Sequence, residues 1–173
     1  ALTPEADLRV FEVDRPAIQD WKRRRLTEMG LEIPAGLYFA PVDFEQQALA
    51  DGLARAGFDA SAPAFFSWLG VSMYLSRPAI ETTLALVADL PEQSGIVFDY
   101  MLDPEMLSTE ARRFYDSLAH RVARAGEPFQ SCFVPEDLAT LLRGLGFNHI
   151  DDHSPQQLDD LYFQGRSDGL RMG

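Results

Sequence analysis

The sequence predicts an α/β fold with a largely parallel sheet, and three observations carry this prediction. Short runs of β-branched and aromatic residues recur along the chain, as in strands. Amphipathic stretches of about ten residues or more, with the apolar spacing of helices, separate most of these runs. Strands separated by helices of that length pair in parallel through βαβ crossovers rather than as hairpins.

The predicted elements follow one another in a regular order. Four strands are expected at residues 8–13, 36–42, 64–69 and 96–100, with two further candidates at 129–133 and 147–151. Helices are expected at residues 16–29, 46–56, 76–90, 109–125 and 135–145, with a short one after the capping-box-like start at Ser154. The basic run Lys22–Arg25 is expected to form the solvated outer face of the first helix.

Length and composition indicate a single domain over residues 1–173, because 173 residues with 46% apolar and 24% charged side chains are typical of one globular domain. The formal charge of −12 argues against partners that need excess positive charge, so neither nucleic acid nor an anionic membrane is expected. No apolar stretch approaches the roughly 18 residues of a spanning helix. Residues 1–7 lack the basic start and apolar centre of a secretory signal, so we expect a soluble, cytoplasmic protein.

Several motifs are tested and set aside. Cys132 is the one cysteine, which excludes an intramolecular disulfide framework and any zinc site built on several thiolates. Gly70–Tyr74 (GVSMY) resembles half of a hydrolase nucleophile elbow, but tyrosine stands where the closing glycine belongs. His149 and His153 stand four residues apart beside acidic residues, yet a predicted strand over 147–151 would not place the two rings on one helical face. No metal is expected.

Asp14 and Asp43 carry more information. Each stands immediately after one of the first two predicted strands. In an open α/β sheet, ligands bind outside the carboxyl ends of the strands, and a carboxylate there can accept two hydrogen bonds from a ribose diol. Capping of the helices that follow fits both positions equally well, so the pattern alone leaves both interpretations open.

The chain resembles the leucine carboxyl methyltransferase-like family. The resemblance starts with Val10–Pro16 (VFEVDRP), Trp21, Lys22 and Leu26, which match an "EvD-x-P … K … L" segment. It continues through Ala40–Phe44 (APVDF), Ala56–Asp59 (AGFD), Phe66–Leu75 (FSWLGVSMYL), Gly126–Phe129 (GEPF), Gly144–Phe147 (GLGF) and Tyr162–Leu170 (YFQGRSDGL). These segments cover nearly the whole chain in order.

The resemblance implies a class I methyltransferase fold that binds S-adenosyl-L-methionine. It implies that Asp14 binds the ribose hydroxyls, that Asp43 accepts a hydrogen bond from the adenine amino group, and that Phe44 offers the ring a backbone N–H and an apolar wall. Glu12 ranks below Asp14, because strand alternation is expected to turn it to the opposite face. Leu69 stands where the family often has a glutamate, which leaves the substrate side less defined.

The chain departs from the family at its start. The family carries a glycine-rich "G-x-G-x-D-x-R" segment after its first strand, which should lie shortly before Val10 and is missing here. In the family that strand lies in the middle of the sheet, between the strands that begin at Leu8 and near Ala64. Its loss would leave unpaired strand edges, so we expect a homo-oligomer or a retained amino-terminal fragment to cover them.

The expected activity of the complete protein is methyl transfer from S-adenosyl-L-methionine to a hydroxyl or carboxylate oxygen of a small-molecule acceptor. In-line displacement depends on alignment and water exclusion, so no catalytic base is obligatory and none is assigned. Tyr74 and Asp99, near strand ends, are candidates, with packing and capping as their alternative roles. The alternative for the whole chain is a non-catalytic domain that assembles without binding the cofactor.

Overall fold

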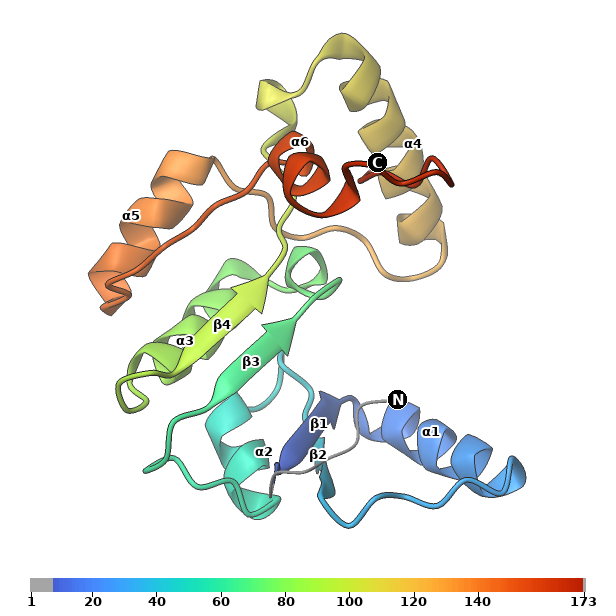
Figure 1. Cartoon of the computed structure of the whole chain (residues 1–173), viewed down its shortest axis with the longest axis vertical. Helices are drawn as coiled ribbons and strands as arrows, with labels where there is room; N and C mark the ends of the chain where they lie inside the picture. The colour runs from blue at the N-terminus through green and yellow to red at the C-terminus, as the bar shows by residue number, and fades with distance from the viewer. Residues whose placement is uncertain (1–7, 173) are drawn as a thin grey trace. The chain divides into compact units, whose positions relative to one another are not determined.

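The computed structural model describes residues 8–172, in which helices and strands alternate as predicted (Figure 1). Residues 1–7, which were expected not to form a secretory signal, lie outside the described residues. The strands are β1 (Val10–Asp14), β2 (Leu37–Pro41), β3 (Phe65–Trp68) and β4 (Gly95–Phe98). The α-helices are α1 (Pro16–Glu28), α2 (Leu49–Arg55), α3 (Arg77–Ala88), α4 (Thr109–Arg124), α5 (Pro135–Leu145) and α6 (Pro155–Leu158). Short turns of other helix types are η1 (Ser72–Tyr74), η2 (Pro104–Met106) and η3 (Asp159–Phe163).

The described residues pack as two compact units, which divide between Phe133 and Val134. The first unit holds β1 to β4 with α1 to α4, and the second holds α5, α6 and η3. The description of one domain over the whole chain therefore stays a prediction. None of the helices within residues 8–172 is both long and apolar enough to cross a membrane.

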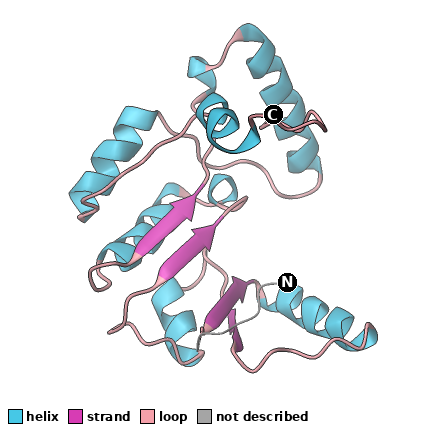
Figure 2. Cartoon of the chain, in the orientation of Figure 1, coloured by secondary structure: helices cyan, strands magenta, loops and turns pink. Residues whose placement is uncertain are grey.

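The strands of the first unit form two parallel pairs (Figure 2). β1 pairs with β2 in the register Val10 to Leu37, and β3 pairs with β4 in the register Phe65 to Gly95. α1 connects the strands of the first pair and α3 those of the second, so both pairs are the predicted βαβ units. Over residues 8–172, no strand hydrogen bond joins β1–β2 to β3–β4.

The core beside β2 forms where α2 packs on the strand pair. Ala40, Val42, Leu49 and Leu53 are buried together there. Aromatic side chains extend this core from β1 to β3, because the Phe58 ring lies 5.4 Å from the Phe11 ring and 6.1 Å from the Phe66 ring, centroid to centroid. Edge-to-face rings at these separations attract one another, so they help to hold the two strand pairs in one unit.

The two further strand candidates are wrong as strands. Residues 129–133 contribute one isolated parallel bridge, between Leu102 and Phe133, and Pro135 then begins α5. Residues 147–151 are irregular. A strand requires a neighbour to bond its peptide groups, and the second unit contains no other strand among its described residues.

Candidate functional site

The pairing of β1 with β2 brings Asp14 and Asp43 to the same edge of the sheet. Asp14 is the last residue of β1 and lies opposite Pro41. The Val42 N–H donates to the Asp14 carbonyl oxygen at 2.9 Å, and Asp43 follows Val42 directly. The predicted placement of both residues at neighbouring carboxyl ends of parallel strands is therefore what the structure has.

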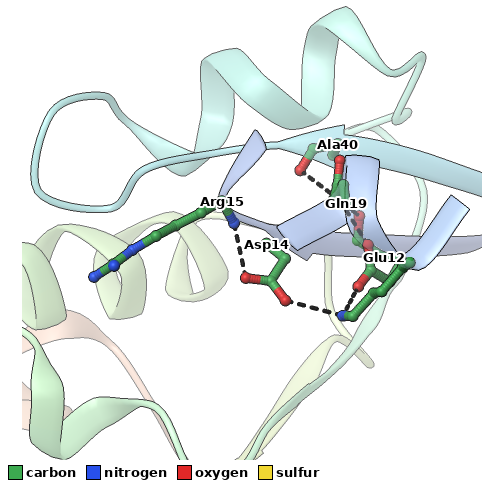
Figure 3. Close-up of polar contacts among 6 residues, drawn as sticks. Glu12, Asp14, Arg15, Gln19 and Ala40 are labelled. Carbon is green, nitrogen blue, oxygen red and sulfur yellow. Dashed lines mark hydrogen bonds and ion pairs between the residues drawn. The ribbon is translucent and has the colours of Figure 1, made fainter. Parts of the chain in front are cut away.

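The Asp14 carboxylate is held by two donors (Figure 3). Its Oδ1 accepts the Arg15 backbone N–H at 2.8 Å, and its Oδ2 lies 2.9 Å from the Lys22 Nζ. The N-cap residue of α1 is Arg15, without a side-chain bond to the helix. Asp14 therefore does not cap α1, and the capping interpretation is wrong for this residue.

Glu12 lies on the same side of β1 as Asp14, contrary to the sequence-based expectation. The Lys22 ammonium contacts both carboxylates, reaching Glu12 Oε1 as well as Asp14 Oδ2. Side chains alternate with a period of two along a strand, so positions 12 and 14 share one face. The expectation that alternation turns Glu12 to the opposite face from Asp14 is therefore wrong. The expectation of a solvated outer face was equally wrong for Lys22, because the first turns of α1 aim it back at β1.

Lys22 stays charged at this site. Partial burial lowers the pKa of Lys22, but hydrogen bonds and charge attraction from Glu12 and Asp14 outweigh this effect and raise the pKa above its usual value. One ammonium thus serves two carboxylates, and the three-residue group keeps a negative charge. Such a group favours hydroxyl donors or a cationic centre as ligands.

Gln19 of α1 lies between Glu12 of β1 and Ala40 of β2 (Figure 3). It is the buried residue of α1, and its Nε2 donates to the Glu12 carbonyl at 2.7 Å and to Glu12 Oε2 at 2.6 Å. The Ala40 carbonyl of β2 lies 3.3 Å from the same nitrogen. The sequence reading missed Gln19 and the role of Lys22. Their spacing of three places both on one face of α1, which is the signal that could have found them.

Asp43 orders the segment that follows β2. Its Oδ1 accepts the Glu45 N–H at 3.1 Å, and its Oδ2 accepts the Gln46 Nε2 at 2.8 Å. The N-cap residue of α2 is Ala48, so Asp43 does not cap that helix. Phe44 is partly buried beside it, with its ring 6.0 Å from the Trp68 ring of β3, centroid to centroid.

The other candidate residues, Asp99, Tyr74 and Ser72, make contacts that stabilise the fold. Asp99 Oδ1 accepts the Gly70 N–H at 2.7 Å, a bond that joins the residue after β4 to the loop after β3 and caps no helix. The Tyr74 ring packs at 5.5 Å from the Phe129 ring. Ser72, of the half nucleophile elbow, is 1% exposed and donates its hydroxyl to the Asp99 carbonyl. A buried hydroxyl bonded in this way is not a nucleophile, so the hydrolase motif stays rejected.

The two carboxylates retain capacity for a ligand. A carboxylate offers about four lone-pair sites, and the hydrogen bonds described above use two at Asp14 and two at Asp43. Leu69, which follows β3, is 58% exposed and supplies an apolar surface. Among residues 8–172 there is no group of three or more His, Cys, Asp or Glu side chains that could hold a metal ion.

The sequence of the chain is similar to a known protein family and to several of its named members. Residues 2–88 match the family model described as leucine carboxyl methyltransferase. YktD of Bacillus subtilis, assigned by name to the S-adenosyl-L-methionine-dependent methyltransferases, is 35% identical over 167 residues, which are 96% of this chain and 55% of YktD. Rv3787c of Mycobacterium tuberculosis, with the same assignment, is 38% identical over 85 residues, 49% of this chain and 27% of that protein.

A solved structure shares the fold. The crystal structure of the S-adenosylmethionine-dependent methyltransferase SibL in its apo form matches with a TM-score of 0.52 at 21% identity. The match covers 86% of this chain and 40% of SibL. The chain thus spans about half the length of YktD and less of the other proteins it matches.

Proposed function

The chain belongs to the leucine carboxyl methyltransferase family, and from this premise we propose that the complete protein methylates an oxygen of a small molecule, a hydroxyl or a carboxylate, with S-adenosyl-L-methionine as donor. The observation that best supports this proposal is the hydrogen bond from the Val42 N–H to the Asp14 carbonyl oxygen. It fixes two acidic residues, Asp14 and Asp43, at adjacent carboxyl ends of parallel strands. The names of YktD and Rv3787c support the same cofactor class.

The fold assignment behind this proposal is a class I methyltransferase sheet that lacks its first strand and its glycine-rich loop. The two parallel βαβ units, β1–α1–β2 and β3–α3–β4, would be the halves of that sheet. The likeness of the chain to SibL supports the common fold.

The residues present fit the nucleoside part of the cofactor. Asp14, backed by Lys22, would accept the ribose hydroxyls, and Asp43 would accept the adenine amino group. The half-buried Phe44 ring, packed beside Trp68, would form an apolar wall for the base. The cofactor supplies an electrophilic methyl group when bound. The chain's own contribution is to orient the nucleoside and to exclude water, and no side chain is assigned as a base.

Calorimetric titration with S-adenosylhomocysteine tests the proposal. A charge-assisted hydrogen bond contributes about 1.5–3 kcal/mol, so Asp43→Ala should weaken binding by roughly ten- to a hundredfold. Asp51→Ala is the matched control, because it removes an exposed carboxylate from α2 away from Asp43's hydrogen bonds. Equal affinity of the two variants would contradict the assigned site.

The non-catalytic domain is the second candidate. One feature favours it for the chain taken alone: the described strands form two separate pairs instead of one sheet. It predicts no heat of binding even at millimolar S-adenosylhomocysteine. The same titration therefore decides between the two functions for this chain.

A further inference from the structure

The indole N–H of Trp68 is a buried donor that has no acceptor among residues 8–172. Trp68 is the last residue of β3 and is 8% exposed. A buried N–H that leaves water without gaining an acceptor costs free energy, and native folds seldom keep one. An acceptor brought by a ligand would therefore gain this hydrogen bond without competition from the described part of the chain.

Trp68 lies in the same region of the first unit as the two candidate carboxylates. It lines a groove of about 840 Å³, and Val13 and Phe44 line the same groove. Val13 directly precedes Asp14, and Phe44 directly follows Asp43. The groove that Trp68 lines therefore extends to residues adjacent to both aspartates.

Two aromatic rings pack against the indole. The Phe44 ring lies 6.0 Å and the Phe98 ring 6.1 Å from the Trp68 ring, centroid to centroid. Phe98 is the last residue of β4, whereas Phe44 belongs to the turn between β2 and α2. Side chains on connecting segments move more readily than those on strands. Rotation of the Phe44 side chain is therefore the smallest change that opens the indole N–H to a ligand.

We propose that Trp68 Nε1 donates a hydrogen bond to an unprotonated ring nitrogen of the adenine of the cofactor. The inference rests on the proposed function, which places the base against Phe44 and its amino group at Asp43. Adenine is flat and uncharged, so it can pack among aromatic side chains while one of its ring nitrogens accepts the indole N–H. The carboxylate of the cofactor is a poorer acceptor here, because aromatic rings surround the indole and a charge among them would lose its hydration.

Nuclear magnetic resonance of the indole N–H groups tests this contact. The chain has two tryptophans, so Trp21→Phe leaves a single indole signal, that of Trp68. Trp21 is 54% exposed on α1, and its replacement leaves β3 unchanged. In this variant, the Trp68 N–H signal should move downfield when S-adenosylhomocysteine saturates the chain. Its exchange with water should slow by roughly tenfold or more, because the N–H gains an acceptor.

Three analogues of S-adenosylhomocysteine, with carbon in place of N1, N3 or N7 of the adenine, identify the acceptor. One analogue should bind roughly five- to fiftyfold more weakly than the parent compound and should not slow the exchange of the Trp68 N–H. Trp68→Phe removes the donor and should weaken binding of the parent compound by a similar factor. The same substitution should hardly change the affinity for that one analogue, because the hydrogen bond is already absent.

Three results would overturn the contact and leave the proposed function intact. In the first, S-adenosylhomocysteine binds without changing the Trp68 N–H signal or its exchange. In the second, Trp68→Phe weakens all four ligands by the same factor, which would mean that Trp68 acts only through packing. In the third, the N–H signal of the ligand-free chain is already that of a hydrogen-bonded donor.

Absence of binding at millimolar S-adenosylhomocysteine would refute the proposed function and this inference together. If Trp68→Phe does not fold, the exchange measurements on Trp21→Phe with the parent compound and the three analogues still decide, because they keep Trp68 in place.

Discussion

Lys22 reaches from α1 to the last residue of β1, where its Nζ lies 2.9 Å from the Asp14 Oδ2 and also contacts the Glu12 carboxylate. The Lys22 and Asp14 side chains are 38% and 32% exposed. Ion pairs this exposed contribute little to the free energy of unfolding. The contact therefore matters mainly because it orients the Asp14 carboxylate beside Glu12.

Lys22→Met should weaken the binding of S-adenosylhomocysteine about three- to thirtyfold. Without the ammonium, Asp14 loses one of its two donors, so its carboxylate is held less firmly in the position proposed for the ribose hydroxyls. Titration calorimetry measures the loss of affinity.

Two variants on the same helix control for packing. Lys22→Arg keeps the charge and should restore most of the affinity. Arg25→Met removes an exposed partner of Glu28 and should leave the affinity unchanged. An affinity of Lys22→Met equal to that of the wild type, or an equal loss of affinity in Lys22→Arg, would contradict the role of the Lys22 charge in orienting Asp14.

Gly52→Ala should destabilise the first unit although alanine is the better helix former. A Cβ at this buried position of α2 would overlap the Val42 Cγ2 methyl group, directly before Asp43. Overpacking costs about 1–3 kcal/mol, against a gain of up to about 1 kcal/mol in helix propensity. Urea unfolding should show a net loss of roughly 1–2 kcal/mol.

Gly144→Ala is the matched control, because a Cβ there meets nothing within 4 Å in α5. It should raise the free energy of unfolding of its own unit by up to about 1 kcal/mol. If Gly52→Ala also raises the free energy of unfolding, α2 can move away from Val42 without loss of stability. The contact between Gly52 and Val42 would then not hold the residues before Asp43 in place.

The alternation of strands and helices could be predicted because it depends on the spacing of apolar and turn residues over short stretches of sequence. The helix expected at residues 135–145 is α5 with the same limits, and the capping box at Ser154 and Gln157 is present. β1 to β4 begin and end within two residues of their predicted limits. Turn residues and apolar periodicity act within a few residues, so a single sequence contains them.

Contacts between elements could not be predicted in this way. α1 has an apolar face, yet Trp21 is 54% exposed, and the residue that α1 buries is Gln19. Asp14 and Asp43 were placed at one edge because parallel pairing fixes where strand ends meet. Their actual partners, Lys22 and Gln46, depend on side-chain directions that residue types alone leave open.

Glu45→Ala should destabilise the start of α3 from a distance. The N-cap residue of α3 is Ser76, and its side chain makes no capping bond. Instead, Glu45 Oε1 accepts the Ser76 N–H at 2.8 Å and Oε2 accepts its hydroxyl at 2.9 Å. Loss of an acidic acceptor at a helix N-terminus costs about 1 kcal/mol, measurable by urea unfolding. Ser76→Ala removes only the hydroxyl bond and should cost less; an equal cost would contradict the role of the backbone contact.

The Tyr115 hydroxyl should lose its proton at an unusually high pH. Burial, followed by its hydrogen bond with the Cys132 thiol at 3.4 Å, raises the pKa of Tyr115 to about 12. An unfolded chain releases this proton near pH 10, so the folded state holds it more tightly. This contribution to stability is complete below about pH 10 and is lost as the pH rises through about 12.

Tyr115→Phe separates this effect from that of Lys22, whose raised pKa acts in the same alkaline range. Tyrosinate absorbance of the wild type should include a step near pH 12 from Tyr115, and that step should vanish in the variant. Between pH 10 and 12 the free energy of unfolding of Tyr115→Phe should fall by about 1–2 kcal/mol less than that of the wild type. Because burial is the first cause of the shift, Cys132→Ala should lower the pKa of Tyr115 only in part. A full return to about 10 in Cys132→Ala would show instead that the thiol, and not burial, holds the proton.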